Sequence, residues 1–542
     1  MLSLFFREDD IVSRLKAKFE LIKKALQKWI VDYHFVIPPA ILKQYVHKFF
    51  HENANINKYS VRYFDPQDPE QYTQWLALQS YDDMKADLSD IAFVSVGKSI
   101  ETSVSVRTIS ELPDLKEQYI CFLGKGVKLY PEAYSYLSEC HKYDLMYFDN
   151  DTEKDGHRCD PVLKPDLSYN TLRGFNYIGN CWVVKKDLLR PLVEKYEDPY
   201  RWLLELSDRD IHVGHIEKIL YCDNESIPNQ DDVLKAYFDD HGIQADVHVN
   251  EDRISRTVWY RFNNEKVSIV IPTKDGMDVL KVCIDSIYEK TTYRNFEIII
   301  ADNGSEKEET LQYFQQLEKE HENLHVIRIE CPFNFSLINN RAVEKASGDY
   351  IVMLNNDTSV ITPDWLEKML SYCTRDNVGS VGVKLWYPDD TIQHGGVIIG
   401  KGGAAAHRYY RCPHDQKGYL YTLEIPNDVS CCTAACLMVK RSVWDELHGM
   451  NEDLPVQFND VDLEIRVMKA GYYNVFLPMV ELYHYESKSR GIDKKKSAVD
   501  RYVMEVEHAK SNWADLIEHD PFYNDNFDKN YDYKLVVGTG SN

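Results

Sequence analysis

The chain has 542 residues, of which 44% are hydrophobic and 28% charged, and its formal net charge at pH 7 is −24. This length exceeds what one ordinary hydrophobic core organises, so we expect about two to four domains. The acidic balance argues against a nucleic-acid-binding protein, because phosphate backbones are bound by clustered Lys and Arg. An anionic ligand must therefore meet local positive groups.

Residues 11–31 carry apolar side chains at helical spacing, with lysines on the remaining surface. A basic amphipathic helix of this kind lies on an anionic membrane or packs against another subunit, and an ordinary surface helix is the alternative. No apolar run reaches the roughly 18 to 20 residues that span a bilayer. We therefore expect a helical segment at 1–60 and a soluble chain that is peripheral at most.

The chain contains 12 cysteines without CxxC pairs, and no signal peptide precedes them. This usage predicts a reducing, cytoplasmic compartment. The neighbouring Cys431 and Cys432 are expected to be packing thiols rather than a bridge.

From Val267 onward, short apolar runs alternate with amphipathic stretches. We expect strands at 267–273, 296–302 and 324–330, a further strand that ends in the run YIVMLNND at 350–357, and helices at 278–290, 306–321 and 336–347. This alternation predicts an α/β fold with a mainly parallel sheet covered on both faces. Each strand is followed by polar residues, so several loops contribute to one cleft at the carboxyl edge of the sheet.

Two of these loops, PTKDG at 272–276 and DNGS at 302–305, suit a nucleotide. A carboxylate there accepts hydrogen bonds from a base or ribose, and backbone N–H groups lie near phosphate. Taken alone, DNGS is also an ordinary turn. Its position after a buried strand favours the binding role.

Asn355, Asn356 and Asp357 end the strand at 350–357 with a cluster of oxygen ligands. Mg²⁺ and Mn²⁺ prefer oxygen ligands and share their shell with phosphates. The alternative is that Asn355 or Asp357 caps the helix that begins near Pro363.

Asp460 and Asp462 stand at the start of a helical pattern in residues 458–470. A carboxylate at a helix N-terminus is held in place by the following turns, which suits a general base. Two positions apart on a helix, the two side chains point differently and are expected to have different roles. Farther on, His484 offers an imidazole to a metal, and Lys488 and Arg490 offer positive charge to a diphosphate.

The motifs VSIVIPTKDG, DNGS, GDYIVMLNNDTSV, NDVDLEIR and LYHYESKSRG occur in this order within residues 266–492. Together they resemble the inverting family 2 glycosyltransferases of the GT-A fold, particularly those of bacterial surface polysaccharides. The resemblance implies transfer from a UDP- or dTDP-sugar to a hydroxyl of a growing glycan, either polysaccharide or glycoprotein, with Mn²⁺ or Mg²⁺. The site residues that it implies are Asp460 as general base; Pro272, Thr273, Asp275, Asp302 and Asn356 at the nucleotide; Lys488 and Arg490 at the diphosphate and acceptor; and Asn355, Asp357 and His484 at the metal.

Two positions depart from the pattern of the family. Asn355 replaces the usual first Asp of the metal motif, which removes one negative charge, and Asn459 replaces the Glu beside the proposed base. These departures keep open an alternative reading as a non-catalytic nucleotide-sugar or glycan-binding scaffold. Nucleotidyl transfer is a third reading, but the chain lacks a Gly-rich triphosphate loop.

Residues 119–129, 144–166 and 176–189 resemble the later part of another GT-A domain. The position of the metal loop is taken by Gly124, Lys125 and Gly126, without a carboxylate. We therefore expect a degenerate transferase-like domain at 61–260, a catalytic GT-A domain at 261–510 and a tail at 511–542. The protein is expected in the cytoplasm, in contact with the inner face of a bacterial membrane or with a second copy through its N-terminal helix.

Overall fold

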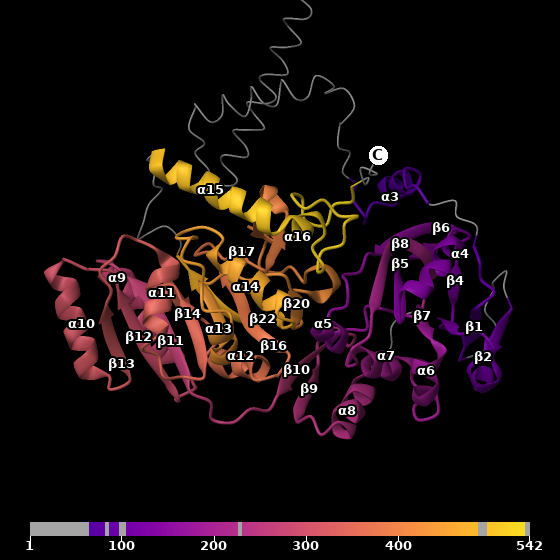
Figure 1. Ribbon diagram of the computed structural model, residues 1–542, viewed down its shortest axis with the longest axis horizontal. Helices are drawn as coiled ribbons and strands as arrows, with labels where there is room; N and C mark the ends of the chain where they lie inside the picture. The colour runs from indigo at the N-terminus through magenta and orange to yellow at the C-terminus, as the bar shows by residue number, and fades with distance from the viewer. Residues whose placement is uncertain (1–63, 82–85, 97–104, 226–229, 486–495, 537–542) are drawn as a thin grey trace, which may run out of the picture. The chain divides into compact units, whose positions relative to one another are not determined.

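The computed structural model describes residues 64–81, 86–96, 105–225, 230–485 and 496–536, and Figure 1 shows their arrangement. Contacts join residues 62–492 and 500–542 into one compact unit. The expected amphipathic helix at 11–31 lies outside the described residues.

The second half of the chain forms a sheet of ten strands. Across the sheet they run in the order β13 (Leu324–Arg328), β12 (Phe296–Asp302), β11 (Val267–Thr273), β14 (Tyr350–Leu354), β21 (Cys436–Lys440), β16 (Val378–Trp386), β22 (Tyr473–His484) and β15 (Thr358–Val360), with β17 (Ile392–His394) beside β16 and β20 (Asn427–Val429) beside β22. Strands β12 and β14 are buried along their whole length, as their continuous apolar runs predict.

The α/β class is confirmed, and the strand directions change partway across the sheet. Strands β13, β12, β11 and β14 are parallel, as predicted. Strand β21 then runs antiparallel to both β14 and β16, whereas β16 and β22 are parallel. The sheet is therefore mixed. The sequence did not predict the direction of β21, because a fully buried strand has the same apolar pattern in either direction.

Helices cover this sheet as the alternation of patterns predicts (Figure 1). They are α9 (Met277–Lys290), α10 (Glu308–Glu320), α11 (Phe335–Val343), α12 (Trp365–Cys373), α13 (Arg441–Glu446) and α14 (Asn459–Lys469). The core beneath them is close-packed, with large side chains such as Trp365 fully buried.

The first half of the chain forms a second sheet, of eight strands. They run in the order β2 (Val106–Thr108), β1 (Ile91–Ser95), β3 (Tyr119–Leu123), β7 (Cys181–Lys185), β5 (Leu145–Lys154), β8 (Val213–Asp223) and β4 (Val127–Leu129), with β6 (His157–Val162) beside β5. Its helices include α3 (Pro69–Leu76), α4 (Ala133–Leu137), α5 (Tyr169–Gly174), α6 (Lys186–Val193), α7 (Pro199–Ser207) and α8 (Asp231–Asp240).

The two halves are joined by a hairpin and by a continuous core. Strands β9 (Ala245–Val249) and β10 (Arg256–Tyr260) pair antiparallel just before the second sheet begins. The Tyr372 hydroxyl of α12 donates to the Val258 carbonyl of β10 at 2.6 Å. One cluster of buried apolar residues contains side chains of both halves, so the halves form a single packed body.

The described residues from 512 to 536 are folded onto both halves. After α16 (Ala514–Glu518), Asp520 accepts hydrogen bonds from Ser430 and from the Ile399 N–H. Asn524 donates to Asp149 of β5 at 3.0 Å. The described part of this segment is thus a strap that contacts both sheets.

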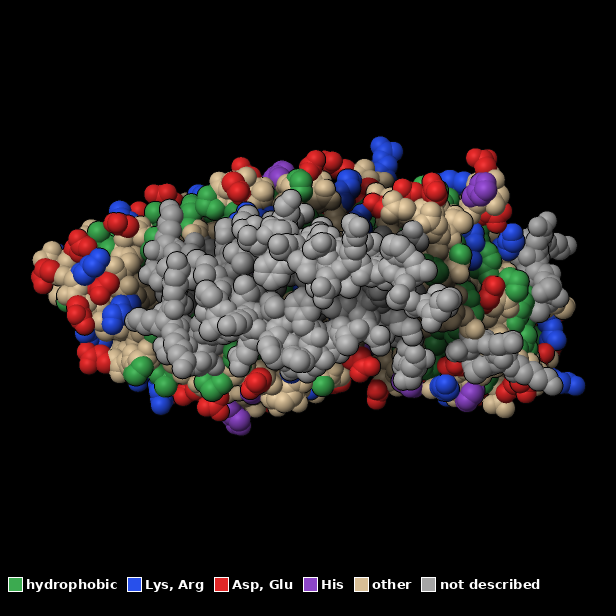
Figure 2. Space-filling model, turned by 90° about the horizontal axis from the view of Figure 1, so that it is seen from above, with side chains coloured by type: hydrophobic (Ala, Val, Ile, Leu, Met, Phe, Trp, Pro, Cys, Tyr) green, Lys and Arg blue, Asp and Glu red, His purple; other side chains and the backbone are tan. Residues whose placement is uncertain are grey.

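The surface seen in Figure 2 carries acidic and basic side chains interspersed among the described residues. Within the described part of the chain, no helix is long and apolar enough to cross a membrane.

Candidate functional site

The polar ends of three neighbouring strands meet at one edge of the second sheet. Strands β11 and β12 end at the paired residues Thr273 and Asp302, and the Asn303 N–H donates to the Thr273 carbonyl at 2.9 Å. From the next strand, the Asn356 amide donates to the Thr273 hydroxyl at 2.9 Å. These contacts bear out the prediction that the loops meet at one edge of the sheet.

The carboxylate of Asp275 organises the start of α10. Its Oδ1 accepts from the Glu306 and Lys307 N–H groups at 2.9 Å each. Partial burial raises the pKa of Asp275, but these two N–H groups and the nearby lysine charges outweigh it and lower that pKa below its usual value. Asp275 is therefore anionic near neutral pH and holds the two loops together.

Asp302 is buried, and both of its carboxylate oxygens have partners. Oδ1 accepts from the Ser305 N–H at 2.8 Å, which closes the DNGS turn. Oδ2 faces the guanidinium of Arg328 at 3.0 Å. The turn is thus present, the nucleotide-binding role of Asp302 stays a prediction, and Arg328 brings a positive group to this edge that the sequence did not predict.

Asp357 and His484 form the corner where the metal is predicted. They are 5% and 8% exposed, and Oδ1 of Asp357 lies 3.2 Å from Nε2 of His484. The Asn355 side-chain nitrogen lies 3.2 Å from the same Nε2. The pairing of β15 with β22 fixes this approach, because Thr358, next to Asp357, is the register partner of His484. The three predicted metal residues therefore converge.

Gln393 of β17 fixes the orientation of the His484 ring. Its Oε1 lies 2.8 Å from Nδ1 of His484. An amide oxygen only accepts, so the Nδ1–H of His484 donates to Gln393, and Nε2 is the ring nitrogen that lies beside Asp357 and Asn355. One imidazole nitrogen, one carboxylate and one amide suit Mn²⁺ or Mg²⁺. Gln393 was not predicted, because it lies 91 positions from His484.

Asp460 is the second residue of α14 and faces the loop before β21. Its Oδ2 accepts from the Ala434 N–H at 3.1 Å, and its Oδ1 accepts from the Val461 N–H at 2.9 Å. The Ala435 carbonyl accepts from the Asn355 N–H at 3.0 Å. Consecutive residues therefore connect the predicted base to the predicted metal loop, so both lie at one site.

Asp462 and Glu464 anchor the same helix. Asp462 accepts from Arg466 at 2.8 Å, so its partner differs from that of Asp460. Glu464 is fully buried and accepts from Ser380 and from the Cys432 N–H. Burial raises the pKa of Glu464 to about 8 against the lowering effect of these two hydrogen bonds.

The remaining predictions divide as follows. Helix α12 begins after Asp364, so neither Asn355 nor Asp357 caps it, and the capping alternative is excluded. Pro272 lies half-buried in β11. Lys488 and Arg490 lie outside the described residues. Cys431 and Cys432 are buried free thiols, as expected.

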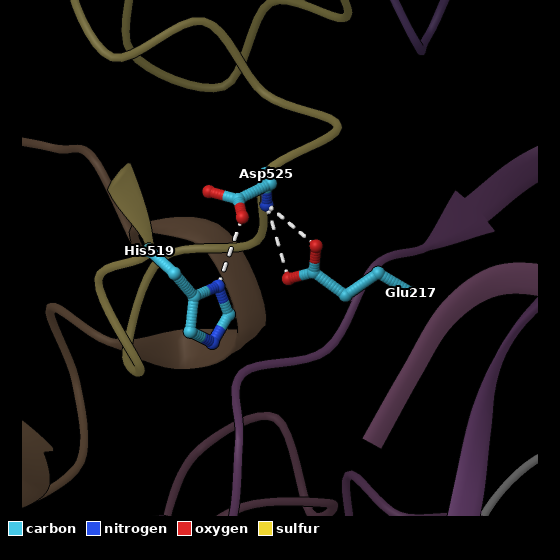
Figure 3. Close-up of side chains that lie close together, drawn as sticks. All are labelled: Glu217, His519 and Asp525. Carbon is cyan, nitrogen blue, oxygen red and sulfur yellow. Dashed lines mark hydrogen bonds and ion pairs between the residues drawn. The ribbon is translucent and has the colours of Figure 1, made fainter. Parts of the chain in front are cut away.

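A second group of ligand-type side chains lies away from this cleft. Glu217, His519 and Asp525 approach one another between the first half and the strap (Figure 3). His519 Nδ1 lies 2.8 Å from Asp525, its Nε2 lies 3.0 Å from Asp166, and Glu217 accepts from the Asp525 N–H. The carboxylates of Asp166 and Asp525 raise the pKa of His519 to about 11. The protonated imidazole therefore links the strap to the first half through ion pairs.

The family model that matches this chain lies within the second half, and two relatives align over more than two thirds of the chain. Residues 268–447 match the family model described as glycosyl transferase family 2. An uncharacterized protein, y4gI, of Sinorhizobium fredii is 37% identical over 409 residues, which are 70% of this chain and 45% of that protein. The O-antigen biosynthesis protein RfbC of Myxococcus xanthus is 31% identical over 403 residues, 69% of this chain and 31% of RfbC.

A shorter match is to the N-acetylglucosaminyl-diphospho-decaprenol L-rhamnosyltransferase of Mycobacterium tuberculosis. It is 23% identical over 221 residues, which cover 37% of this chain and 70% of that protein. The chain spans less than half the length of y4gI and of RfbC.

Proposed function

The chain contains a family 2 glycosyltransferase domain at residues 268–447, and we propose that it transfers a sugar from a UDP- or dTDP-sugar to a hydroxyl of a growing bacterial surface glycan. The observation that carries this proposal is the convergence of Asp357, His484 and Asp460 around the dipeptide Ala434–Ala435. The similarity to RfbC supports a polysaccharide as the acceptor.

Asp460 is the proposed general base. It removes the proton of the acceptor hydroxyl while that oxygen attacks the anomeric carbon from the side opposite the leaving nucleotide. The single displacement inverts the anomeric configuration. The Ala434 N–H holds the carboxylate in place without neutralising it.

Asn355, Asp357 and His484 are the proposed ligands of Mn²⁺ or Mg²⁺. The ion, when bound, supplies positive charge to the leaving diphosphate. Thr273, Asp275, Asp302 and Asn356 shape the nucleotide side of the cleft, and Lys488 and Arg490 are proposed to meet the diphosphate and the acceptor. We place the reaction in the cytoplasm at the inner face of the membrane, on the basic helical pattern of residues 11–31.

The test is a screen of UDP- and dTDP-sugars with Mn²⁺ for donor hydrolysis by the full chain, followed by acceptor trials and assignment of the product anomer by NMR. Asp460→Asn should lower transfer by about 10²- to 10⁴-fold while donor binding, measured by calorimetry, is kept. Asp453→Asn, an exposed acid in the preceding loop, is the matched control. Full transfer by the Asp460 variant would refute the base assignment.

The departures at Asn355 and Asn459 favour one second candidate, a scaffold that binds nucleotide sugars without turnover. Both candidates predict donor binding, so turnover separates them. Donor binding without hydrolysis or transfer for any sugar in the screen would establish the scaffold.

A further inference from the structure

The two sheets have the same strand order and the same strand directions. The strands of the first sheet correspond one by one to strands of the second. The order in the first sheet is β2, β1, β3, β7, β5, β8, β4, and the matching order in the second is β12, β11, β14, β21, β16, β22, β15. Strand β6 corresponds to β17. In both sheets the first three strands are parallel, the fourth is antiparallel to its neighbours, the fifth and sixth are parallel, and the seventh is antiparallel. The first half is therefore a second copy of this architecture.

Backbone contacts define which residues correspond at the cleft edge. Leu123 pairs with Cys181 in the first copy as Leu354 pairs with Cys436 in the second. The Gly124 N–H donates to the Asn180 carbonyl at 2.7 Å, as the Asn355 N–H donates to the Ala435 carbonyl at 3.0 Å. Val127 pairs with Asp223 as Thr358 pairs with His484. Gly124, Lys125 and Gly126 thus occupy the places of Asn355, Asn356 and Asp357. Asp223 occupies the place of His484.

The first copy has no room for ligands in its loop. Gly126 has a φ of +79°, and a Cβ there would lie 2.8 Å from Cγ of Glu225. A Cβ on Gly124 would lie 2.6 Å from Cβ of Asn180. Because both contacts are shorter than van der Waals distance, side-chain ligands at these two positions are excluded without movement of the loop.

The remaining carboxylate of the first copy is already bonded. Asp223 accepts from the Asn180 amide at 2.9 Å and from the Glu225 N–H at 3.1 Å. Close by, the ammonium group of Lys164 is fully buried and donates to the Phe148 and Ile178 carbonyls and to the Tyr221 hydroxyl. Burial lowers the pKa of Lys164 to about 8, and the positive charge that it carries at neutral pH opposes the binding of a second cation here.

Among the described residues, the position that meets the proposed base in the second copy meets no carboxylate in the first. Gly179 corresponds to Ala434, since each lies two residues before the first residue of its strand. The Ala434 N–H meets the carboxylate of Asp460, whereas the Gly179 N–H donates to the amide oxygen of Asn176 at 3.3 Å. An amide does not accept a proton near neutral pH.

We propose that the first half is a catalytically silent second copy of the transferase architecture, so that each chain has one divalent-metal site and one transfer site, both in the second half. This inference rests on the proposed function for the metal site. It assigns the first half a structural role, holding strand β20 of the working copy through α5.

The test counts Mn²⁺ ions bound per full-length chain by electron paramagnetic resonance, with donor hydrolysis measured in parallel. We expect one ion per chain. Asp357→Asn should abolish this binding and lower hydrolysis by at least tenfold, whereas the matched Asp223→Asn should retain one ion and full hydrolysis, because Asp223 lies outside the proposed metal site and an Asn oxygen still accepts one of its two hydrogen bonds.

Two ions per chain in the wild type would overturn the proposal while leaving the transferase function standing, and this count does not depend on whether a variant folds. Loss of ion or hydrolysis in Asp223→Asn alone, with an unchanged melting temperature, would also overturn it. Absence of both ion binding and turnover in the wild type would instead count against the proposed function. Gly124→Ala, which crowds Asn180, should leave the ion count at one.

Discussion

The backbone N–H of Ala434 lies 3.1 Å from the carboxylate of Asp460 and donates to it. The next residue accepts from the Asn355 N–H, so the proposed base and the metal loop are tied to one dipeptide. The residues that lead into this dipeptide follow Asp428, whose carboxylate is held by the first half. The first half therefore holds the segment that leads into the proposed site.

Replacing Gln393 with Leu should weaken Mn²⁺ binding about 10- to 100-fold, as loss of an outer-shell partner of a metal-bound histidine does. The physical reason is that Nδ1 of His484 loses the acceptor that orients its ring. A Mn²⁺ titration by electron paramagnetic resonance measures the effect. Gln393→Glu keeps an acceptor and is the control, and equal affinities of the Leu variant and the wild type would contradict the assigned role.

Replacing Asn355 with Asp should tighten Mn²⁺ binding by about tenfold, because a unit negative charge is added beside the ion. The change also removes the amide nitrogen that lies 3.2 Å from Nε2 of His484. The same titration gives the affinity, and Asn356→Asp shows the effect of charge alone. Weaker binding by the Asn355 variant would show that this position is not a ligand.

Glu464 makes stability depend on pH with a defined sign. Its pKa rises from the ordinary 4.5 to about 8 in the folded chain, so the protonated form is favoured by folding. The contribution is fully present below pH 4.5 and is lost as pH rises through 8. Urea unfolding between pH 5 and 9 should show this decline in the wild type and less of it in Glu464→Gln, and identical slopes would rule out the assignment.

Asp428 joins the halves through a buried carboxylate. It accepts from the Ser168 hydroxyl at 3.0 Å and from the Asn170 N–H at 2.8 Å and amide at 2.5 Å. Asp428→Ala leaves these donors without an acceptor and should lower the free energy of unfolding by about 2–4 kcal/mol. Asp415→Ala, at an exposed position, is the control in urea unfolding. A loss no larger than that of the control would mean that the contact contributes little.

Local sequence patterns sufficed for the elements that carry the cleft. The strands expected at 267–273 and 296–302 coincide with β11 and β12, because continuous apolar runs that stop at polar residues specify buried strands and their ends. The metal residues were predicted from the oxygen ligands at 355–357 and from the family resemblance, and in the structure Asp357 lies three residues after β14 and His484 ends β22. The absence of a carboxylate at Gly124, Lys125 and Gly126 was also visible in the sequence.

Only the tertiary structure decided four features of the site and its surroundings. They are the direction of β21, the contact of His484 with Gln393, the contact of Ala434 with Asp460, and the folding of the last described residues onto both sheets. Each depends on which distant segments become neighbours, and an apolar strand pattern is the same for parallel and antiparallel pairing. The correspondence of the two sheets is of this kind as well. The sequence determined which residues are chemically able to hold a metal or take a proton, and packing determined which of them meet, because hydrogen bonds act over about 3 Å regardless of separation along the chain.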